Sequence, residues 1–280
     1  MEGIRRRGLT YTRNHAKIKC FDYSIFRSIF RDLNRLFSNM SDMRTRYALR
    51  LMGRVLVLVV CFFCFVYEPD LFNVLQGWNF FRGFSWLHLL WGVWVIDMAA
   101  QLFPLKAHIS LGSQKMWKMR FQPLKEKFSV DALKKHIVNT TRAAYKVMLL
   151  WIALIGLIGY LHYAGVLSDK ALFLITVIFY VCDLICVLIW CPFRLIMRNR
   201  CCTTCRIFNW DHLMMFSPLL FFPSFYCWSL LALSIAACAV WEIFIFLHPE
   251  RFWAESNAAL KCANCTDKLC TQYCQKLRKK

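Results

Sequence analysis

The chain has 280 residues, of which 59% are hydrophobic, and it carries a formal net charge of +20. An ordinary soluble domain is about 45–50% apolar, so this composition excludes a simple water-soluble globular protein. High hydrophobicity combined with excess basic charge is typical of a membrane protein with basic cytosolic loops, so no nucleic-acid partner is predicted. The sequence contains none of the common nucleotide-binding, metalloprotease or serine-hydrolase motifs, and it does not decide whether the protein is an enzyme.

Residues 1–46 are predicted to form a basic cytosolic or interfacial segment. Residues 1–50 hold twelve Lys and Arg residues against four acids. Apolar side chains recur at helical spacing and arginines fall on the other side, which predicts an amphipathic helix. Such a helix either lies among the headgroups of an anionic inner leaflet or packs on the protein's own cytosolic loops. The apolar positions are Phe26, Ile29, Phe30, Leu33, Leu36 and Phe37.

Residues 47–190 are predicted to form a four-helix membrane region. About 20 apolar residues are enough for a helix to cross a hydrocarbon core about 30 Å thick. The basic loop 105–146 is expected on the cytosolic side, and the alternation of apolar and basic residues in 115–121 predicts a membrane-surface segment. Ser129 is the expected N-cap of a helix that leads into the third span. The four predicted spans are residues 47–67, 86–103, 146–163 and 171–190.

Residues 191–280 combine a cysteine cluster, a membrane hairpin and a cysteine-rich tail. The apolar block from Leu213 to Leu247 has 35 residues. As one helix it would be about 52 Å long, too long for a core about 30 Å thick. We therefore predict two spans, residues 207–222 and 226–247; a re-entrant helix at 207–222 is the alternative.

The distribution of basic residues supports six spans. In this arrangement 33 Lys and Arg residues lie in the inside segments, and only Arg82 and Lys170 lie in the outside loops. The positive-inside rule then places both termini and both cysteine clusters in the cytosol, in a cell or inner membrane. The predicted fold is all-α and polytopic, with about six transmembrane helices, an amphipathic N-terminal helix and a small cysteine-rich cytosolic knob.

Eight of the fifteen cysteines lie in the two clusters. Because the cytosol is reducing, clustered cysteines there favour metal or redox chemistry over structural disulfides. Two CxxC turns together offer four thiolates, which complete a tetrahedral zinc site or ligate one iron–sulfur cluster. The hairpin would return the second turn to the membrane face of the first. The predicted metal ligands are Cys202, Cys205, Cys262, Cys265, Cys270, Cys274, Cys201 and Cys191.

The choice between zinc and iron–sulfur stays open at this point, because coordination number does not separate them. The tail pattern C-x2-C-x4-C-x3-C is near the ferredoxin pattern but does not match it. The alternative is that the cysteines bind no metal and that some are palmitoylated near the bilayer. Cysteines within the spans are assigned to packing, as small hydrophobic residues. These are Cys61, Cys64, Cys182, Cys186, Cys227 and Cys238.

Three carboxylates, Asp97, Asp183 and Glu242, fall within predicted spans. A carboxylate at the bilayer centre costs about 2.5–3.5 kcal/mol on insertion scales, so each needs a reason. Three interpretations are open: a path for protons or cations, a polar layer on the membrane side of the metal site, or local ion pairs with Arg or Lys. Local pairing is favoured for Glu242, and the choice is open for the two aspartates. Arg54 is expected to snorkel to the inner interface, and His212 is an alternative metal ligand.

The preferred function is membrane-bound electron transfer through a thiolate-ligated iron–sulfur centre. It would connect a cytosolic redox partner with a membrane carrier such as a quinone. The alternative is a transporter or assembly factor in which zinc is structural and the intramembrane carboxylates carry the function. An enzyme acting on lipid at the inner leaflet ranks last, because the sequence shows no paired acid and base or nucleophile motif for it.

Overall fold

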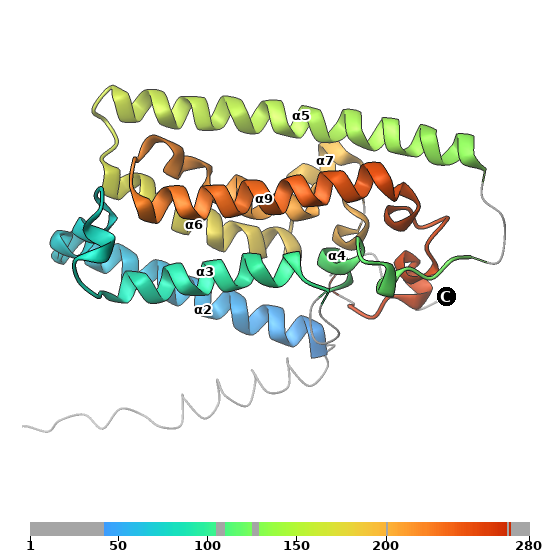
Figure 1. Ribbon diagram of the computed structural model, residues 1–280, viewed down its shortest axis with the longest axis horizontal. Helices are drawn as coiled ribbons and strands as arrows, with labels where there is room; N and C mark the ends of the chain where they lie inside the picture. The colour runs from blue at the N-terminus through green and yellow to red at the C-terminus, as the bar shows by residue number, and fades with distance from the viewer. Residues whose placement is uncertain (1–41, 105–109, 125–128, 200, 268, 270–280) are drawn as a thin grey trace, which may run out of the picture. The chain divides into compact units, whose positions relative to one another are not determined.

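The computed structural model of the chain describes residues 42–104, 110–124, 129–199, 201–267 and 269 (Figure 1). Their regular secondary structure is helical, which confirms the predicted all-α class for this part of the chain. Residues 1–41, which include every apolar position of the predicted amphipathic helix, lie outside the described residues. The longer helices are α2 (Asp42–Tyr67), α3 (Trp86–Leu102), α5 (Val130–Tyr163), α6 (Asp169–Leu188) and α9 (Phe225–Leu247), and the shorter ones are α4 (Leu111–Gln114), α7 (Phe193–Met197) and α8 (Asp211–Phe216).

Four helices in the described part are long and apolar enough to cross a membrane. They are Met43–Tyr67, Val130–Tyr163, Asp169–Leu188 and Phe225–Leu247. Helix α3 has 17 residues, which makes it about 26 Å long, and it ends just before Pro104. These helices indicate a membrane protein.

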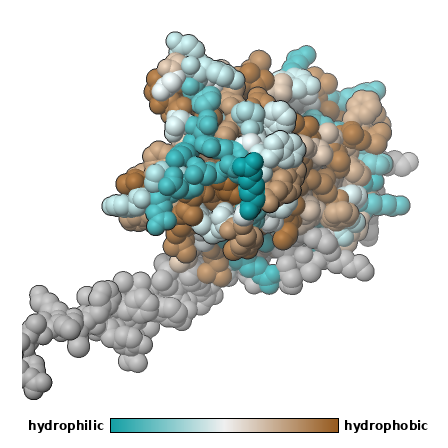
Figure 2. Space-filling model, turned by 60° about the vertical axis from the view of Figure 1, so that its left-hand side comes forward, coloured by the Kyte–Doolittle hydropathy of each residue, from teal (hydrophilic) through white to brown (hydrophobic). Residues whose placement is uncertain are grey.

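The outer surfaces of these helices are apolar. Leu56 and Phe63 on α2 are 64% and 56% exposed, and Phe246 on α9 is 86% exposed. Figure 2 shows hydrophobic side chains over large areas of the face it draws, with hydrophilic patches between them. Contiguous apolar surface of this kind is unfavourable in water and compatible with a lipid bilayer.

Helix α5 is longer than the others. Its 34 residues make it about 51 Å long, so it extends beyond a hydrocarbon core of about 30 Å. It begins directly after Ser129 and runs unbroken through the predicted third span. Its first turns carry Lys134, Lys135 and His136, and they lie at the end of the bundle where α3 and α9 end (Figure 1). We call this end, which also holds Cys202 and Cys262, the cysteine end.

The predicted fifth span, residues 207–222, is not one continuous helix. It consists of η5 (Phe208–Trp210), α8 and η6 (Ser217–Phe221), and the six residues of α8 extend only about 9 Å. The segment nevertheless runs beside α9 for most of that helix. Arg206 bonds Glu242 near the end of α9, whereas residue 225 begins α9 at the opposite end of the bundle.

The connection between α2 and α3 closes the opposite end. Its short helix η1 (Pro69–Leu75) buries Phe72 and Leu75, which are 1% and 0% exposed. The Phe72 ring packs edge-on against Phe173 of α6, with centroids 5.8 Å apart. Trp78 in the same connection is 71% exposed.

Residues 207–222 are called the broken segment from here on. A matched pair of glycines on α5 tests how this segment packs. A Cβ at Gly159 would fall on the Phe221 ring, whereas a Cβ at Gly156 would meet nothing within 4 Å. Gly159→Ala is expected to lower the free energy of unfolding by about 1–3 kcal/mol through overpacking. Gly156→Ala should leave it unchanged or raise it by up to about 1 kcal/mol. Thermal unfolding in detergent measures both; equal effects would contradict the packing described.

Candidate functional site

Asp97 and Asp183 meet between helices α2, α3 and α6. Arg54 lies between them: its Nη1 donates to Asp183 Oδ2 at 2.6 Å, and its Nη2 lies 3.7 Å from Asp97 Oδ2. Arg54 also donates to the carbonyl of Tyr180 at 2.6 Å and lies over the Tyr180 ring. An opposite charge with good hydrogen bonds is what offsets the desolvation of buried carboxylates, so Arg54 holds this site together.

The expectation that Arg54 snorkels to the interface is wrong. The residue is 8% exposed, because its side chain turns inward to Asp183 on α6 rather than along α2 toward water. The sequence contained a signal for the Arg54–Asp183 ion pair, since each is a charged residue within an apolar helix. Two such charges of opposite sign in different helices are natural partners.

Two residues of α8 extend this network. His212 Nε2 lies 3.4 Å from Asp97 Oδ2, and His212 Nδ1 lies 3.0 Å from Asp211 Oδ1. Gln101 Nε2 is also 3.2 Å from His212 Nδ1. The structure therefore places His212, expected as an alternative metal ligand, among carboxylates rather than thiols.

The network surrounds a polar cavity of about 80 Å³. Three carboxylates line it, together with Arg54 and with Arg50 at its exposed rim. The three carboxylates and two arginines together carry one negative charge when His212 is neutral. Protonation of His212 makes the network neutral. A change in protonation at the network therefore changes its net charge inside the bundle. The lining carboxylates are Asp97, Asp183 and Asp211.

Glu242 has separate partners. Its Oε1 and Oε2 accept from Arg206 Nη1 and Nη2, both at 2.6 Å, and Oε1 also accepts from Trp210 Nε1 at 2.7 Å. This bidentate geometry is the local pairing that the sequence favoured for Glu242. It ties the start of the broken segment to α9.

The first CxxC motif forms a short 3-10 turn, η4 (Cys202–Thr204). The Cys205 N–H donates to the Cys202 carbonyl at 2.9 Å. The turn places the two cysteines three residues apart on one short 3-10 segment, and the Cys202 thiol donates to the Cys186 carbonyl at 3.9 Å. Such a turn can present both thiols to one ion.

A buried lysine supports this turn from behind. Lys115 follows α4 and is 0% exposed; its Nζ donates to the carbonyls of Thr203 at 2.7 Å and Cys205 at 3.0 Å. Its ammonium also lies 5.2 Å from the centre of the Trp241 ring. The prediction that residues 115–121 form a membrane-surface segment is therefore wrong for its first two residues, since Met116 is only 2% exposed.

Burial sets the protonation of these groups. It raises the pKa of Cys202 to about 12 and also raises the pKa of Cys205, while it lowers the pKa of Lys115 to about 8. The two thiols therefore stay protonated near neutral pH unless a cation joins them. A coordinated metal ion reverses this balance, because a coordinating thiol loses its proton.

The second CxxC motif folds in the same way as the first. It forms η9 (Cys262–Asn264), and the Cys265 N–H donates to the Cys262 carbonyl at 3.4 Å. Two residues later, the buried Asp267 accepts from the backbone N–H of Leu111 in α4 at 2.8 Å. Burial raises the pKa of Asp267, and nearby Cys201 acts in the same direction. The tail therefore packs on the same short helix whose following residue, Lys115, binds the first turn.

The structure brings the two turns to the same end of the bundle but not into one ligand set. No group of three or more His, Cys, Asp or Glu side chains among the described residues is arranged to hold a metal ion. Cys270 and Cys274 lie outside the described residues. Cys201 lies beside the first turn, whereas Cys191 pairs with Cys186 at the end of α6.

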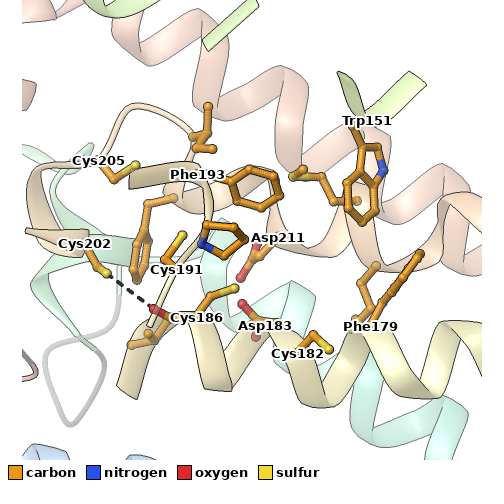
Figure 3. A pocket seen from close by; sticks show the side chains of 16 residues that line it. Trp151, Phe179, Cys182, Asp183, Cys186, Cys191, Phe193, Cys202, Cys205 and Asp211 are labelled. Carbon is orange, nitrogen blue, oxygen red and sulfur yellow. Dashed lines mark hydrogen bonds between the residues drawn. The ribbon is translucent and has the colours of Figure 1, made fainter. Parts of the chain in front are cut away.

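An apolar cavity of about 290 Å³ lies beside the first turn, between α5, α6, α7 and α8. Figure 3 shows Cys191, Cys202 and Cys205 at one side of it, Trp151, Phe179 and Cys182 at the other, and the carboxylates of Asp183 and Asp211 between them. Cys182 and Cys186, which were assigned to packing, both line the cavity. Cys61 and Cys227 are 0% exposed within the apolar core, as expected. The cavity cysteines are Cys182, Cys186, Cys191, Cys202 and Cys205.

Comparison of the chain with models of protein families, with curated proteins and with solved structures gives no match. The function is therefore argued from the site alone.

Proposed function

We propose that the chain is a multi-pass membrane protein that binds an iron–sulfur centre through cysteines at the cytosolic membrane surface. It would pass electrons between a cytosolic donor and a carrier in the membrane. The observation that carries this proposal is the pair of matching CxxC turns, both attached to α4 and the residue after it.

The residues of the two turns suit a thiophilic metal. Each turn offers only thiols, and the proposed ligands are Cys202 and Cys205 from the first turn and Cys262 and Cys265 from the second. Cys201, Cys270 and Cys274 remain further candidates on the two segments. When bound, an iron–sulfur cluster supplies a centre that takes up and releases one electron. Bringing the four thiols together requires the tail to shift toward the first turn, because they do not form one group among the described residues.

Lys115 has a defined role in this proposal. In many such centres the negative charge of four thiolates exceeds the positive charge of the metal they bind. A nearby cation offsets the net negative charge. Lys115 places its ammonium behind the first turn and fixes that turn through two carbonyls. Hydrogen bonds and charges around the sulfurs are among the features that set a cluster's reduction potential.

The membrane topology of the proposal has six passes with both termini in the cytosol. Four long apolar helices, α3 and the broken segment beside α9 support the number of passes. The excess of Lys and Arg in the segments at the cysteine end supports the orientation. The anionic inner leaflet would then be the surface that the basic segments contact.

A second function is favoured by the charge network. The network of Arg54, Asp97, Asp183, Asp211 and His212 could carry protons or cations in a transporter or assembly factor. Zinc at the CxxC turns would then be structural. In that case Asp97→Asn abolishes activity while loss of a CxxC cysteine chiefly lowers stability.

Metal content and visible absorption of protein purified without oxygen test the proposal. Iron with sulfide and broad visible absorption are expected. One zinc and a colourless sample would instead favour the second function, and a metal-free protein would contradict both metal assignments.

Single cysteine replacements assign the ligands. Cys202→Ser and Cys262→Ser are each expected to remove most of the bound metal, because a site of four thiolates loses affinity when one is missing. Cys64→Ser on α2 is the control and should keep the metal. Retention of metal in both CxxC variants would show that the turns are not its ligands.

A further inference from the structure

Cys186 and Cys191 form a pair of thiols at the end of α6. The helix ends at Leu188, and the N–H of Trp190 donates to the Ile185 carbonyl at 3.1 Å. This wide turn folds the chain back, so that the side chains of Cys186 and Cys191 lie near one another on the wall of one cavity (Figure 3). Two neighbouring thiols can act as a dithiol, and Cys191 lies in a short connection where the backbone can adjust to form a bridge.

The pair opens into the apolar cavity of about 290 Å³. Aromatic rings form much of its wall: Trp151 comes from α5, Phe179 from α6 and Phe208 from the broken segment. Flat walls of this kind suit a flat, apolar ring, which packs on aromatic faces. The volume lies just below the usual range of ligand sites, about 300–1,000 Å³, so the ligand is small.

One edge of the cavity is polar. Asp183 and Asp211 lie on its wall, and the same two residues also line the polar cavity around Arg54. Their carboxylates are hydrogen-bond acceptors facing an otherwise apolar space. A ligand that fits has an apolar ring and hydroxyl groups that donate at one edge, as a hydroquinone does.

We propose that this cavity binds a quinone and that the Cys186–Cys191 dithiol reduces it. The two S–H bonds break and an S–S bond forms between the two cysteines. Two electrons and two protons pass to the quinone, whose carbonyl oxygens become hydroxyl groups. The dithiol is oxidised to a disulfide and the quinone is reduced to the hydroquinone.

The disulfide returns to the dithiol by exchange with a cytosolic protein dithiol, which is itself oxidised to a disulfide. The inference rests on the proposed function only in its membrane carrier, which it identifies as a quinone. The electrons come from thiols here, so this step needs no metal at the CxxC turns.

The test uses the full-length protein in detergent, reduced and kept without oxygen. The probe is a short-chain ubiquinone analogue with a fully substituted ring, which leaves no free ring carbon for thiol addition. About one hydroquinone per protein is expected, together with a Cys186–Cys191 disulfide identified by mass spectrometry. Cys186→Ser and Cys191→Ser are expected to lower hydroquinone formation at least tenfold. Cys182→Ser is the matched control, since Cys182 lines the same cavity, and it should react as the unaltered protein does.

The outcomes separate the two proposals. A Cys262→Ser protein that lacks metal but still forms hydroquinone and the disulfide supports the dithiol step, whatever becomes of the metal. Loss of hydroquinone in this variant with the dithiol intact would instead assign the electrons to the metal and overturn the inference. A bridge between other cysteines, undiminished reaction in the Cys186 and Cys191 variants, or no reaction at all would also overturn it. Mapping of the disulfide in the unaltered protein keeps the test decisive where a variant does not fold.

Discussion

Replacement of Arg54 by Met is expected to unfold the bundle or to leave it severely destabilised. The change removes the charge that lies 2.6 Å from Asp183 and 3.7 Å from Asp97. Breaking a buried ion pair by removing one partner costs about 3–5 kcal/mol, because the other charge stays buried without compensation. The yield of monodisperse protein in detergent and its unfolding temperature measure the effect.

Two further variants show whether charge is the cause. Arg50→Met is the control, since Arg50 lies one turn earlier on α2 and is exposed; it should unfold close to the unaltered protein. Asp183→Asn introduced together with Arg54→Met should recover a large part of the lost stability, because it removes the uncompensated carboxylate. If Arg54→Met behaved like Arg50→Met, the central role of this ion pair would be refuted.

Replacement of Lys115 by Met is expected to disrupt the first CxxC turn while the membrane helices stay folded. The change leaves the carbonyls of Thr203 and Cys205 without their buried donor. A buried polar group that loses its hydrogen bond costs about 1–3 kcal/mol. Under the proposed function the variant should therefore lose most of its metal, which elemental analysis measures.

Lys118→Met provides the comparison. Lys118 lies on the same segment but is exposed, so its loss removes one positive charge without touching the turn. It should keep both its metal and its unfolding temperature. Equal metal content in the two variants would mean that Lys115 supports the fold but not the metal site.

Long apolar runs made the membrane helices predictable from the sequence. Helix α2 ends directly before Glu68 and Pro69, and α9 covers the predicted sixth span with one added residue. Charged residues and prolines end such helices whatever the rest of the fold is. The local sequence therefore decides where each helix ends. The continuation of α5 toward its N-terminus follows from the same local pattern after Ser129, although the sequence did not show that the two helices merge.

The site was less predictable, because its contacts join distant parts of the chain. Lys115 alternates with apolar residues as a surface lysine does, and only its bonds to Thr203 and Cys205 explain its burial. Cys186 looked like a packing residue, because the fold-back that brings Cys191 to it depends on how α6 ends. The two CxxC turns were predicted at the same end of the bundle, and the structure places them there. Their joining into one metal site stays a prediction.

The broken segment beside α9 has a consequence for the order of biosynthesis. It contains Asp211, His212 and Pro218 and has no long helix, so it is a poor membrane anchor while it emerges from the ribosome. It is expected to settle in the bilayer only once α9 is made and the two insert as a pair, held by the Arg206–Glu242 bonds. The first CxxC turn precedes this pair and the second follows it, so under the proposed function cofactor loading is one of the last steps in maturation. A ribosome stalled before residue 225 would then hold a chain that lacks both α9 and the second CxxC turn, and the proposed metal site could not form.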